Sequence, residues 1–231
     1  MIDYHSHVLP AMDDGAKDVP MALAMLEQAG RQGVDTVVAT PHFYAAEDTT
    51  ESFFARRQNR YEQLLPALNA QYPQLLLGAE VLVWEGMSKV DWRPFCMQGT
   101  NLLLVEFPFS TMPYWLVEEL ENIILVQGLT VVLAHLERYI PWYTKQNMAQ
   151  LLDLPDVVVQ LDCDSLTSGF RLHSIAKWLK APDRMVFGTD IHNADTRAPQ
   201  MEKAVRTLSR SRIGRLWLDS VERTTKILPE L

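Results

Sequence analysis

Residues 2–15 read Ile-Asp-Tyr-His-Ser-His-Val-Leu-Pro-Ala-Met-Asp-Asp-Gly, a short strand-like run that carries two histidines two positions apart. Alternate side chains of a β-strand point to the same face, so His5 and His7 would direct both imidazoles to one side. Neutral imidazoles suit transition-metal ions, and the acidic pair Asp13 and Asp14 follows before a glycine. A lone His-x-His pair is equally compatible with a strand that holds two polar residues. The positions of the other histidines therefore decide between these interpretations.

The overall composition is that of a globular enzyme. The sequence has 231 residues, enough for one domain with a sizeable hydrophobic core. Its hydrophobic fraction of 48% and charged fraction of 22% are ordinary for this class. The formal net charge of -8 argues against non-specific binding of DNA or RNA, which needs a basic footprint, although it does not exclude a local basic groove. We therefore expect no nucleic-acid partner.

Cysteine usage and hydropathy indicate the cellular compartment. Cys96 and Cys163 are the two cysteines, and neither belongs to a Cys-x-x-Cys pair, so no disulfide framework or zinc knuckle is predicted. The N-terminus lacks a basic region followed by an apolar run, which argues against a secretory signal. No apolar run approaches the roughly 18 residues needed to cross a bilayer. We expect a cytoplasmic protein without direct membrane insertion, which leaves attachment to a membrane partner open.

Short apolar runs alternate with segments of helical periodicity along the whole chain. Asp18 is expected to cap the first helix and Gly33 to end it, and residues 43–52 are expected to form a loop over the site. After the opening strand, the expected strands are residues 34–40, 75–81, 101–107, 130–134, 157–161 and 185–188. The later helices are expected at residues 53–71, with Pro66 ending or kinking the helix, and at 114–127, 147–154, 171–179, 199–210 and 218–228.

This alternation predicts an α/β fold with a parallel sheet. The strands are continuous apolar runs, as expected when both faces of a sheet are buried. About seven strand–helix units fit a (β/α)7 barrel, slightly smaller than the eight-fold TIM barrel. A doubly wound open sheet is the alternative. No linker or repeat divides the chain, so residues 1–231 are expected to form a single domain.

Histidines and acids gather where the expected strands end, which is the active-site face of a parallel barrel. One histidine at a strand end is readily explained as a carbonyl cap, but five of the six histidines fall at such ends. Such a cluster could not stay charged and close together without cations, so two or more metal ions are inferred. Nitrogen and oxygen ligands without sulfur fit Mn²⁺, Zn²⁺ or Fe. The candidate residues are His5, His7, His42, Glu80, Glu106, His135, Asp190 and His192.

Three further features complete the candidate site. Arg138 and Arg197 follow His135 and His192 closely and would lie on the same rim, where guanidinium groups could hold phosphate oxygens in bidentate pairs. Their alternative interpretation is as surface arginines. The sixth strand ends instead at Asp162 and Asp164, and the sixth histidine, His173, lies within an expected helix as a surface or packing residue. Phosphoester hydrolysis is the reaction that most needs a multi-metal site with arginines.

Motifs at these strand ends resemble the CpsB/YwqE-like bacterial tyrosine-protein phosphatases of capsule and exopolysaccharide synthesis, within the polymerase-and-histidinol-phosphatase (PHP) superfamily. The resemblance covers nearly the whole chain and preserves the order and spacing of the motifs. The motifs are residues 5–10 (His-Ser-His-Val-Leu-Pro), 13–16 (Asp-Asp-Gly-Ala), 39–42 (Ala-Thr-Pro-His), 78–81 (Gly-Ala-Glu-Val), 106–108 (Glu-Phe-Pro), 134–139 (Ala-His-Leu-Glu-Arg-Tyr) and 190–193 (Asp-Ile-His-Asn).

The resemblance implies a distorted (β/α)7 TIM-like barrel of the PHP type that forms one phosphoesterase domain. It implies a trinuclear site, usually manganese with iron or zinc as alternatives, in which metal-bound hydroxide hydrolyses phosphotyrosine on the C-terminal tail of a bacterial tyrosine kinase. By matching motif, it assigns three sets of metal ligands: His5, His7, Glu80 and Asp190; Glu80, Glu106 and His135; and Asp14, His42 and His192. It also assigns Arg138 and Arg197 to the binding of the phosphate.

Some residues depart from the family pattern. Leu136 stands where the family usually has proline, and Ile191 where it has a small residue. Asp162 and Asp164 would add negative charge near the mouth, and residues 219–222 lack the Asn-Pro that the family often carries. These changes bear on the substrate more than on metal binding.

Other functions are weighed against this one. A cysteine-based phosphatase needs an arginine six residues after the thiolate, and Leu102 and Gly169 occupy those positions. A small-molecule PHP phosphoesterase, acting for example on histidinol phosphate, would use the same metals. A metal-binding adaptor without turnover is the non-enzymatic alternative. A nuclease is disfavoured by the acidic charge balance.

Overall fold

The computed structural model describes residues 1–179 and 182–227. The expected end of the last helix at Leu228 lies outside these residues. The strands are β1 (Ile2–Ser6), β2 (Thr36–Ala39), β3 (His42–Phe43), β4 (Gln74–Leu77), β5 (Glu80–Leu82), β6 (Leu102–Glu106), β7 (Thr130–Leu133), β8 (Val157–Asp162) and β9 (Met185–Gly188). The α-helices are α1 (Val19–Arg31), α2 (Thr50–Leu64), α3 (Leu116–Gln127), α4 (Lys145–Leu152), α5 (Gly169–Leu179), α6 (Met201–Ser209) and α7 (Arg212–Ile227).

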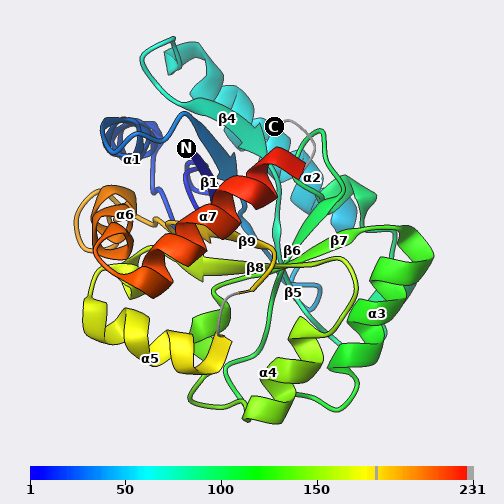
Figure 1. The fold of residues 1–231 in the computed structure, drawn as a ribbon. Helices are drawn as coiled ribbons and strands as arrows, with labels where there is room; N and C mark the ends of the chain where they lie inside the picture. Colours follow the sequence, from blue (N-terminus) through cyan, green and yellow to red (C-terminus); the bar gives the residue numbers. More distant parts are fainter. Residues whose placement is uncertain (180–181, 228–231) are drawn as a thin grey trace.

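The described strands pair in parallel throughout and form two sheets. One sheet has the order β1-β2-β4, and the other has the order β3-β5-β6-β7-β8-β9. Figure 1 shows the strands converging at the centre of the molecule, with the helices arranged around them. The predicted α/β class with parallel strands is confirmed. Within the described residues the hydrogen-bonded ladders form these two sheets and no single closed sheet.

The strand predicted at residues 75–81 is divided into β4 and β5, and the strand predicted at residues 34–40 is followed by an unpredicted short strand, β3; these breaks separate the sheets. Pro41 follows β2 and has no N–H to donate, so the ladder is interrupted there. The chains nevertheless stay adjacent across the break, because Gly78 N donates to Ala39 O at 2.8 Å and Glu80 N donates to Pro41 O at 3.0 Å. As a result β4 pairs only with β2, whereas β5 pairs with both β3 and β6.

The two sheets also meet where β1 lies beside the end of β9. Ser6 and Ile191 form a parallel bridge, and His7 N donates to Ile191 O at 3.0 Å. Asp190 N donates to His5 O at 2.9 Å. These bonds hold the first and last strands together at the point where both carry candidate metal ligands.

The helices follow the sequence pattern closely at several ends. Asp18 caps α1, its carboxylate accepting from Met21 N at 2.9 Å, and α3 ends at Gly128 in the left-handed region with φ 68°. The predicted boundaries of residues 53–71 are wrong. The Thr49 side chain caps α2 three residues earlier, and Pro66 lies in a separate 3-10 turn after the helix ends. The loop over the site is therefore shorter than expected.

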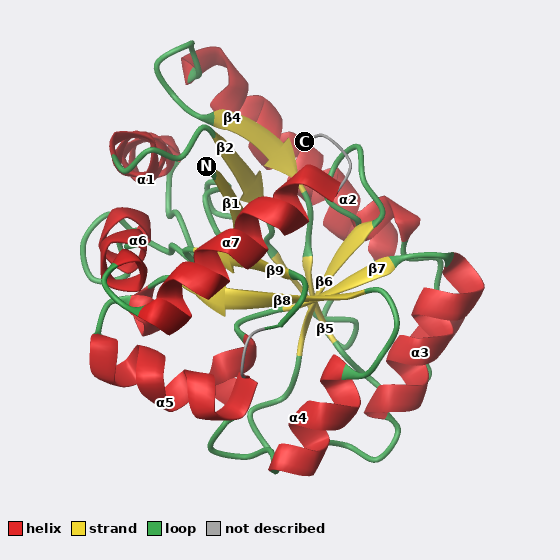
Figure 2. Cartoon of the chain, in the orientation of Figure 1, coloured by secondary structure: helices red, strands yellow, loops and turns green. Residues whose placement is uncertain are grey.

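Helix α7 covers the end of the strands opposite the candidate site. Met185 N at the start of β9 donates to Thr224 Oγ1 at 3.0 Å, and Ser220 Oγ donates to Pro182 O at 2.8 Å. Figure 2 shows α7 crossing in front of the strands. The carboxyl ends of the strands, on the other side, are left for the site. His173 lies exposed in α5, as expected. No helix in the described part of the chain has the length and apolar character needed to cross a membrane.

Candidate metal centre

The structure brings all nine predicted metal ligands together at the carboxyl ends of the strands. Their nitrogen and oxygen atoms form four overlapping groups, each with its ligand atoms within 4.8 Å of one another. Seven of these side chains are buried, His42 is partly buried and Asp14 is exposed. The groups are His5, His7 and Asp190; His5, Glu80 and His135; His42, Glu80 and Glu106; and His7, Asp14, His42 and His192.

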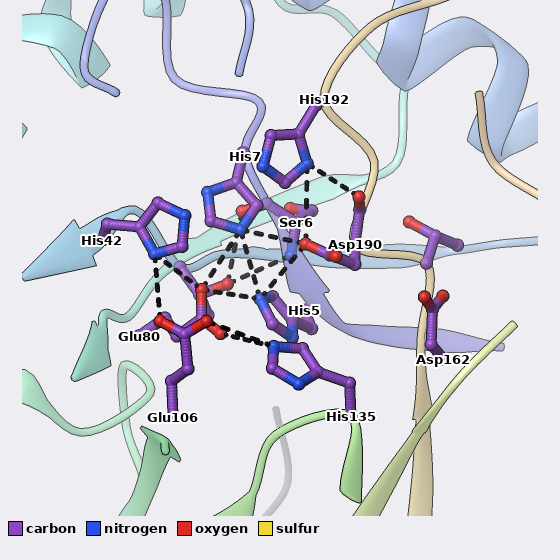
Figure 3. Close-up of polar contacts among 12 residues, drawn as sticks. His5, Ser6, His7, His42, Glu80, Glu106, His135, Asp162, Asp190 and His192 are labelled. Atoms are coloured by element: carbon purple, nitrogen blue, oxygen red, sulfur yellow. Dashed lines mark hydrogen bonds and ion pairs between the residues drawn. The ribbon is translucent and has the colours of Figure 1, made fainter. Parts of the chain in front are cut away.

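Glu80 lies in the middle of the cluster, at the first position of β5, and is fully buried. Its Oε2 is 2.9 Å from His42 Nδ1 and 3.1 Å from His5 Nε2. Its Oε1 is 3.0 Å from His135 Nε2 (Figure 3). One carboxylate therefore contacts imidazoles from three separate strand ends, which is the arrangement expected of a ligand shared between neighbouring cations.

Three imidazoles present a lone pair to the cluster. His5 Nδ1 lies 3.1 Å from Gln160 Oε1, His7 Nδ1 lies 2.7 Å from Asp13 Oδ2, and His192 Nδ1 lies 2.8 Å from a backbone carbonyl. Each of these acceptors favours a proton on Nδ1, which leaves Nε2 as a bare acceptor. His5 Nε2 and His7 Nε2 are only 3.2 Å apart. Two facing lone pairs among carboxylates fit divalent metal ions, which supply the missing positive charge.

The pKa shifts describe the same excess of negative charge. Burial raises the pKa of Glu106 above its ordinary value, and the nearby Glu80 carboxylate raises it further. Burial lowers the pKa of His5, but attraction to Glu80 and Asp190 outweighs it and raises that pKa to about 9. Burial raises the pKa of Asp13, and the His7 imidazole more than reverses this, to about 2. Without cations, the cluster must take up protons to remain buried.

Asp190 connects the cluster to the two predicted arginines. Its Oδ1 lies 3.2 Å from His7 Nε2. Its Oδ2 accepts from Arg138 Nη2 at 2.6 Å and from Arg197 Nη2 at 3.0 Å. Both guanidinium groups are partly exposed, so each can also reach a bound anion. Burial lowers the pKa of Arg138, but Asp162 and Asp190 raise it above its ordinary value, so this cation stays charged.

Two ligand positions have unusual backbone conformations. His135 has φ 31° and Asp190 has φ 48°, in the left-handed region that non-glycine residues seldom adopt. Such conformations cluster at functional sites, where the surrounding structure maintains them. Each residue lies two positions after the last residue of a strand, His135 after β7 and Asp190 after β9, where the turn places its side chain in the cluster.

Comparison with known proteins identifies the family. Residues 1–223 match the family described as capsular polysaccharide synthesis, CpsB/CapC. The chain belongs to this family. It is 31% identical over 222 residues to the tyrosine-protein phosphatase YwqE of Bacillus subtilis, covering 91% of this chain and 84% of YwqE. It is 25% identical over 245 residues to the tyrosine-protein phosphatase CpsB of Streptococcus agalactiae, covering 98% of each chain.

Solved structures of CpsB/CapC relatives share the fold. A chain from the crystal structures of YwqE from Bacillus subtilis and CpsB from Streptococcus pneumoniae, described as unique metal-dependent tyrosine phosphatases, matches with a TM-score of 0.78. The sequence identity is 25%, and the match covers 98% of this chain and 94% of that chain. The resemblance inferred from the strand-end motifs is confirmed.

In this CpsB/CapC member the residues that depart from the family pattern are accommodated. Leu136 and Ile191 are buried beside candidate ligands. Asp162 is buried and pairs with Arg138, while the exposed Asp164 lies 3.4 Å from Arg171. The negative charge expected near the mouth is therefore largely paired with arginines.

Sequence reasoning did not single out the side chains that orient the ligands in this CpsB/CapC protein. Gln160 is fully buried, and its Oε1 accepts from His135 N at 2.6 Å as well as facing His5. A glutamine inside the run Val-Val-Val-Gln-Leu was the available signal, because a buried amide needs partners. Gly188 packs against the same pair. A Cβ added there would lie 2.5 Å from His5 Cβ and 2.7 Å from Gln160 Nε2.

Proposed function

We propose that this chain is a metal-dependent phosphatase that hydrolyses phosphotyrosine on protein. The observation that carries the proposal is the buried cluster of imidazoles and carboxylates with two arginines converging on Asp190 Oδ2. The relatives named tyrosine-protein phosphatases support it, since they match over most of their length. Residues 1–231 would act as a single PHP-type phosphoesterase domain.

The cluster would hold two to three divalent ions, with manganese as our assignment and iron or zinc as alternatives. When bound, such ions supply a water that ionises at neutral pH and neutralise charge on the phosphoryl group. The residues that would hold them are His5, His7, Glu80 and Asp190 for one ion, Glu80, Glu106 and His135 for a second, and Asp14, His42 and His192 for a third. The groups His5, His7 and Asp190 and His7, Asp14, His42 and His192 support the first and third sets. For the second set, His135 Nε2 lies 3.0 Å from Glu80 Oε1 and 3.8 Å from Glu106 Oε1.

The remaining residues would bind and orient. Arg138 and Arg197 would hold the non-bridging phosphate oxygens, because both are charged, partly exposed and directed at the edge of the cluster. Asp13 and Gln160 would hold the imidazoles of His7 and His5 in one orientation. A tyrosine leaving group has a pKa of about 10, so a strong general acid is unnecessary.

We also propose that the two sheets act as one distorted (β/α)7 barrel. The nine strands of the described residues occupy seven positions when β2 with β3 and β4 with β5 are taken as interrupted single strands. The hydrogen bonds between the ends of β1 and β9 support closure. The distortion would arise at Pro41 and Gly78, where the interrupted strands change partners.

The substrate would be a phosphotyrosine protein of the bacterial cytoplasm, with the C-terminal tail of a tyrosine kinase that controls capsule or exopolysaccharide synthesis as our specific proposal. The family's description as capsular polysaccharide synthesis supports this choice.

The test combines elemental analysis with turnover. Purified protein is assayed for bound metals, then for phosphate release from phosphotyrosine peptides and from histidinol phosphate, with and without a chelator and after Mn²⁺ is restored. We expect phosphotyrosine turnover that the chelator abolishes and Mn²⁺ restores. A large preference for histidinol phosphate would indicate a small-molecule phosphoesterase instead. A metal-loaded protein without any turnover would indicate a metal-binding adaptor.

A further inference from the structure

An exposed aromatic ring stands at the edge of the metal centre. Phe109 lies in the loop after β6 and is 47% exposed. Its ring centroid is 6.1 Å from that of His135, and the two planes are inclined by 21°. His135 Nε2 is itself 3.0 Å from Glu80 Oε1 in the middle of the cluster. One imidazole therefore separates an open aromatic face from the atoms that would hold the metals.

The ring is held by its neighbours. Phe109 stacks on Tyr139 with centroids 5.2 Å apart and planes 19° apart, and it contacts Trp142 at 5.5 Å. Tyr139 is fully buried, and its hydroxyl accepts from Phe107 N at 3.0 Å, which ties the loop after β6 to the turn after β7. A large apolar ring that is held by neighbouring rings and is still half-exposed is suited to stacking with a ligand.

We propose that Phe109 stacks against the phenyl ring of a phosphotyrosine whose phosphate occupies the metal centre, and so favours aryl over alkyl phosphates. This inference rests on the proposed function and specifies how the substrate is selected. Only a bridging oxygen separates the phosphorus of an aryl phosphate from its ring, so the ring must lie just outside the phosphate site. Aromatic rings prefer centroid separations of about 4.5–7 Å, which suits a phenyl ring that packs on Phe109 beside His135, at the edge of the cluster.

The opposite flank of the cluster is less suitable for this role. Tyr44 stacks on His42 with centroids 5.1 Å apart. The pocket beside it is lined by Glu47, Asp48 and Arg56. Arg56 pairs with Asp48 at 2.8 Å, so Glu47 remains as the net charge that would face an anionic ester there. On the Phe109 side, the partly exposed Trp142 instead extends the aromatic surface outward. Phe109 is therefore the ring that the structure assigns to the substrate.

The experiment compares Phe109→Ala and Phe109→Leu with wild type. It measures kcat/KM for phenyl phosphate and a phosphotyrosine peptide, and the inhibition constant of inorganic phosphate, which has no ring. We expect kcat/KM to fall about tenfold for both aryl esters, the gain expected of one aromatic pair with its burial, while phosphate inhibition changes less than about twofold. Phe109→Trp should retain most of the wild-type kcat/KM.

The matched control is Tyr114→Ala. Tyr114 is 88% exposed in the same loop, and its hydroxyl donates to Glu85. Tyr114→Ala should leave kcat/KM for the aryl esters and the inhibition constant of phosphate unchanged. The inference is overturned if Phe109→Ala and Phe109→Leu keep wild-type kcat/KM, if phosphate inhibition weakens equally, or if Tyr44→Ala alone causes the aryl-specific loss. A wild-type protein without aryl-phosphate turnover rejects the proposed function and this inference together. Active wild type with unchanged Phe109 variants rejects only the inference.

Discussion

Asp13 accepts a hydrogen bond from His7 Nδ1 at 2.7 Å, so the loop after β1 sets the orientation of an imidazole in the metal centre. The other ring nitrogen of His7 is thereby directed at Asp190 and Glu80. Asp13 also accepts from the backbone N of His42 at 3.1 Å. Its pKa of about 2, which the His7 imidazole brings down against the effect of burial, keeps it ionised at neutral pH. Asp13 thus contacts two candidate ligands, His7 through its imidazole and His42 through its backbone N.

The variant Asp13→Asn should weaken metal binding by about 10–100-fold, the usual effect of losing a carboxylate that orients a ligating histidine. The carboxamide keeps the size of the side chain but removes the charge that polarises His7. The measurement is a Mn²⁺ titration of chelator-treated protein, with bound metal counted by elemental analysis. Asp164→Asn is the control, because Asp164 is exposed and pairs with Arg171. An unchanged Mn²⁺ dissociation constant in Asp13→Asn would show that Asp13 plays no such role.

The variant Gly188→Ala should disturb His5 directly. Because the added Cβ would lie 2.5 Å from His5 Cβ and 2.7 Å from Gln160 Nε2, either the strand or these side chains must shift. We expect a loss of about 1–3 kcal/mol in the free energy of unfolding, as for other overpacked cores, together with weaker metal binding. Urea unfolding measures the first effect. Gly169→Ala is the control, since nothing lies within 4 Å of the Cβ it would add. Equal stabilities of the two variants would contradict the close packing.

The clustering of the candidate ligands could be predicted from the sequence because a parallel α/β chain delivers its strand ends to one face. His42, Glu80 and His135 lie far apart in the chain, yet each follows or ends an apolar run, and the structure brings both imidazoles into contact with Glu80. The strand expected at residues 34–40 ends before Pro41, as in the structure, but nothing in the sequence indicated the short strand β3 after it. Periodicity could not reveal the break at Gly78 either, because a strand that changes partners keeps its apolar pattern. The left-handed backbone at His135 and Asp190 was equally inaccessible, since neither residue is a glycine.

The pairing of Asp162 with Arg138 could not be predicted from the sequence for a related reason. From the sequence it is an extra carboxylate near the mouth, whereas in the structure it is buried and paired with Arg138, which arrives from the preceding strand end. Whether a carboxylate at one strand end meets an arginine from the neighbouring strand end depends on which side chains lie on the same face of the sheet and on how far the arginine extends. Those are properties of the folded chain rather than of any local segment.

Both cysteines should be inert in the folded protein. Burial raises the pKa of the Cys96 thiol to about 12, and burial raises that of Cys163 well above its ordinary value. A thiol whose pKa is raised carries almost no thiolate at neutral pH, so alkylation should be slow. We expect iodoacetamide to leave native protein unmodified and phosphatase activity unchanged, while both cysteines react in urea. Mass spectrometry counts the adducts. Loss of activity on alkylation of the folded protein would contradict a mechanism without cysteine.

Asp3 should make the free energy of unfolding depend on pH. It is fully buried, accepts from Thr189 N at 2.8 Å, and burial raises its pKa from 3.8 to about 6 despite these hydrogen bonds. Because the folded state holds this proton more tightly than the unfolded state, Asp3 contributes stability below about pH 4 that is lost as the pH rises through 6. Two pKa units correspond to roughly 3 kcal/mol.

Asp3→Asn should remove that dependence. In urea unfolding of chelator-treated protein, the free energy of unfolding of wild type should fall relative to the variant between pH 4 and pH 7, because only wild type must ionise a buried carboxyl. Chelator treatment prevents metal release from contributing to the pH profile. Asp219→Asn, at an exposed position in α7, should follow the wild-type profile. If the difference in the free energy of unfolding between wild type and Asp3→Asn stayed constant across this range, the folded protein would not raise the pKa of Asp3, and the prediction would be wrong.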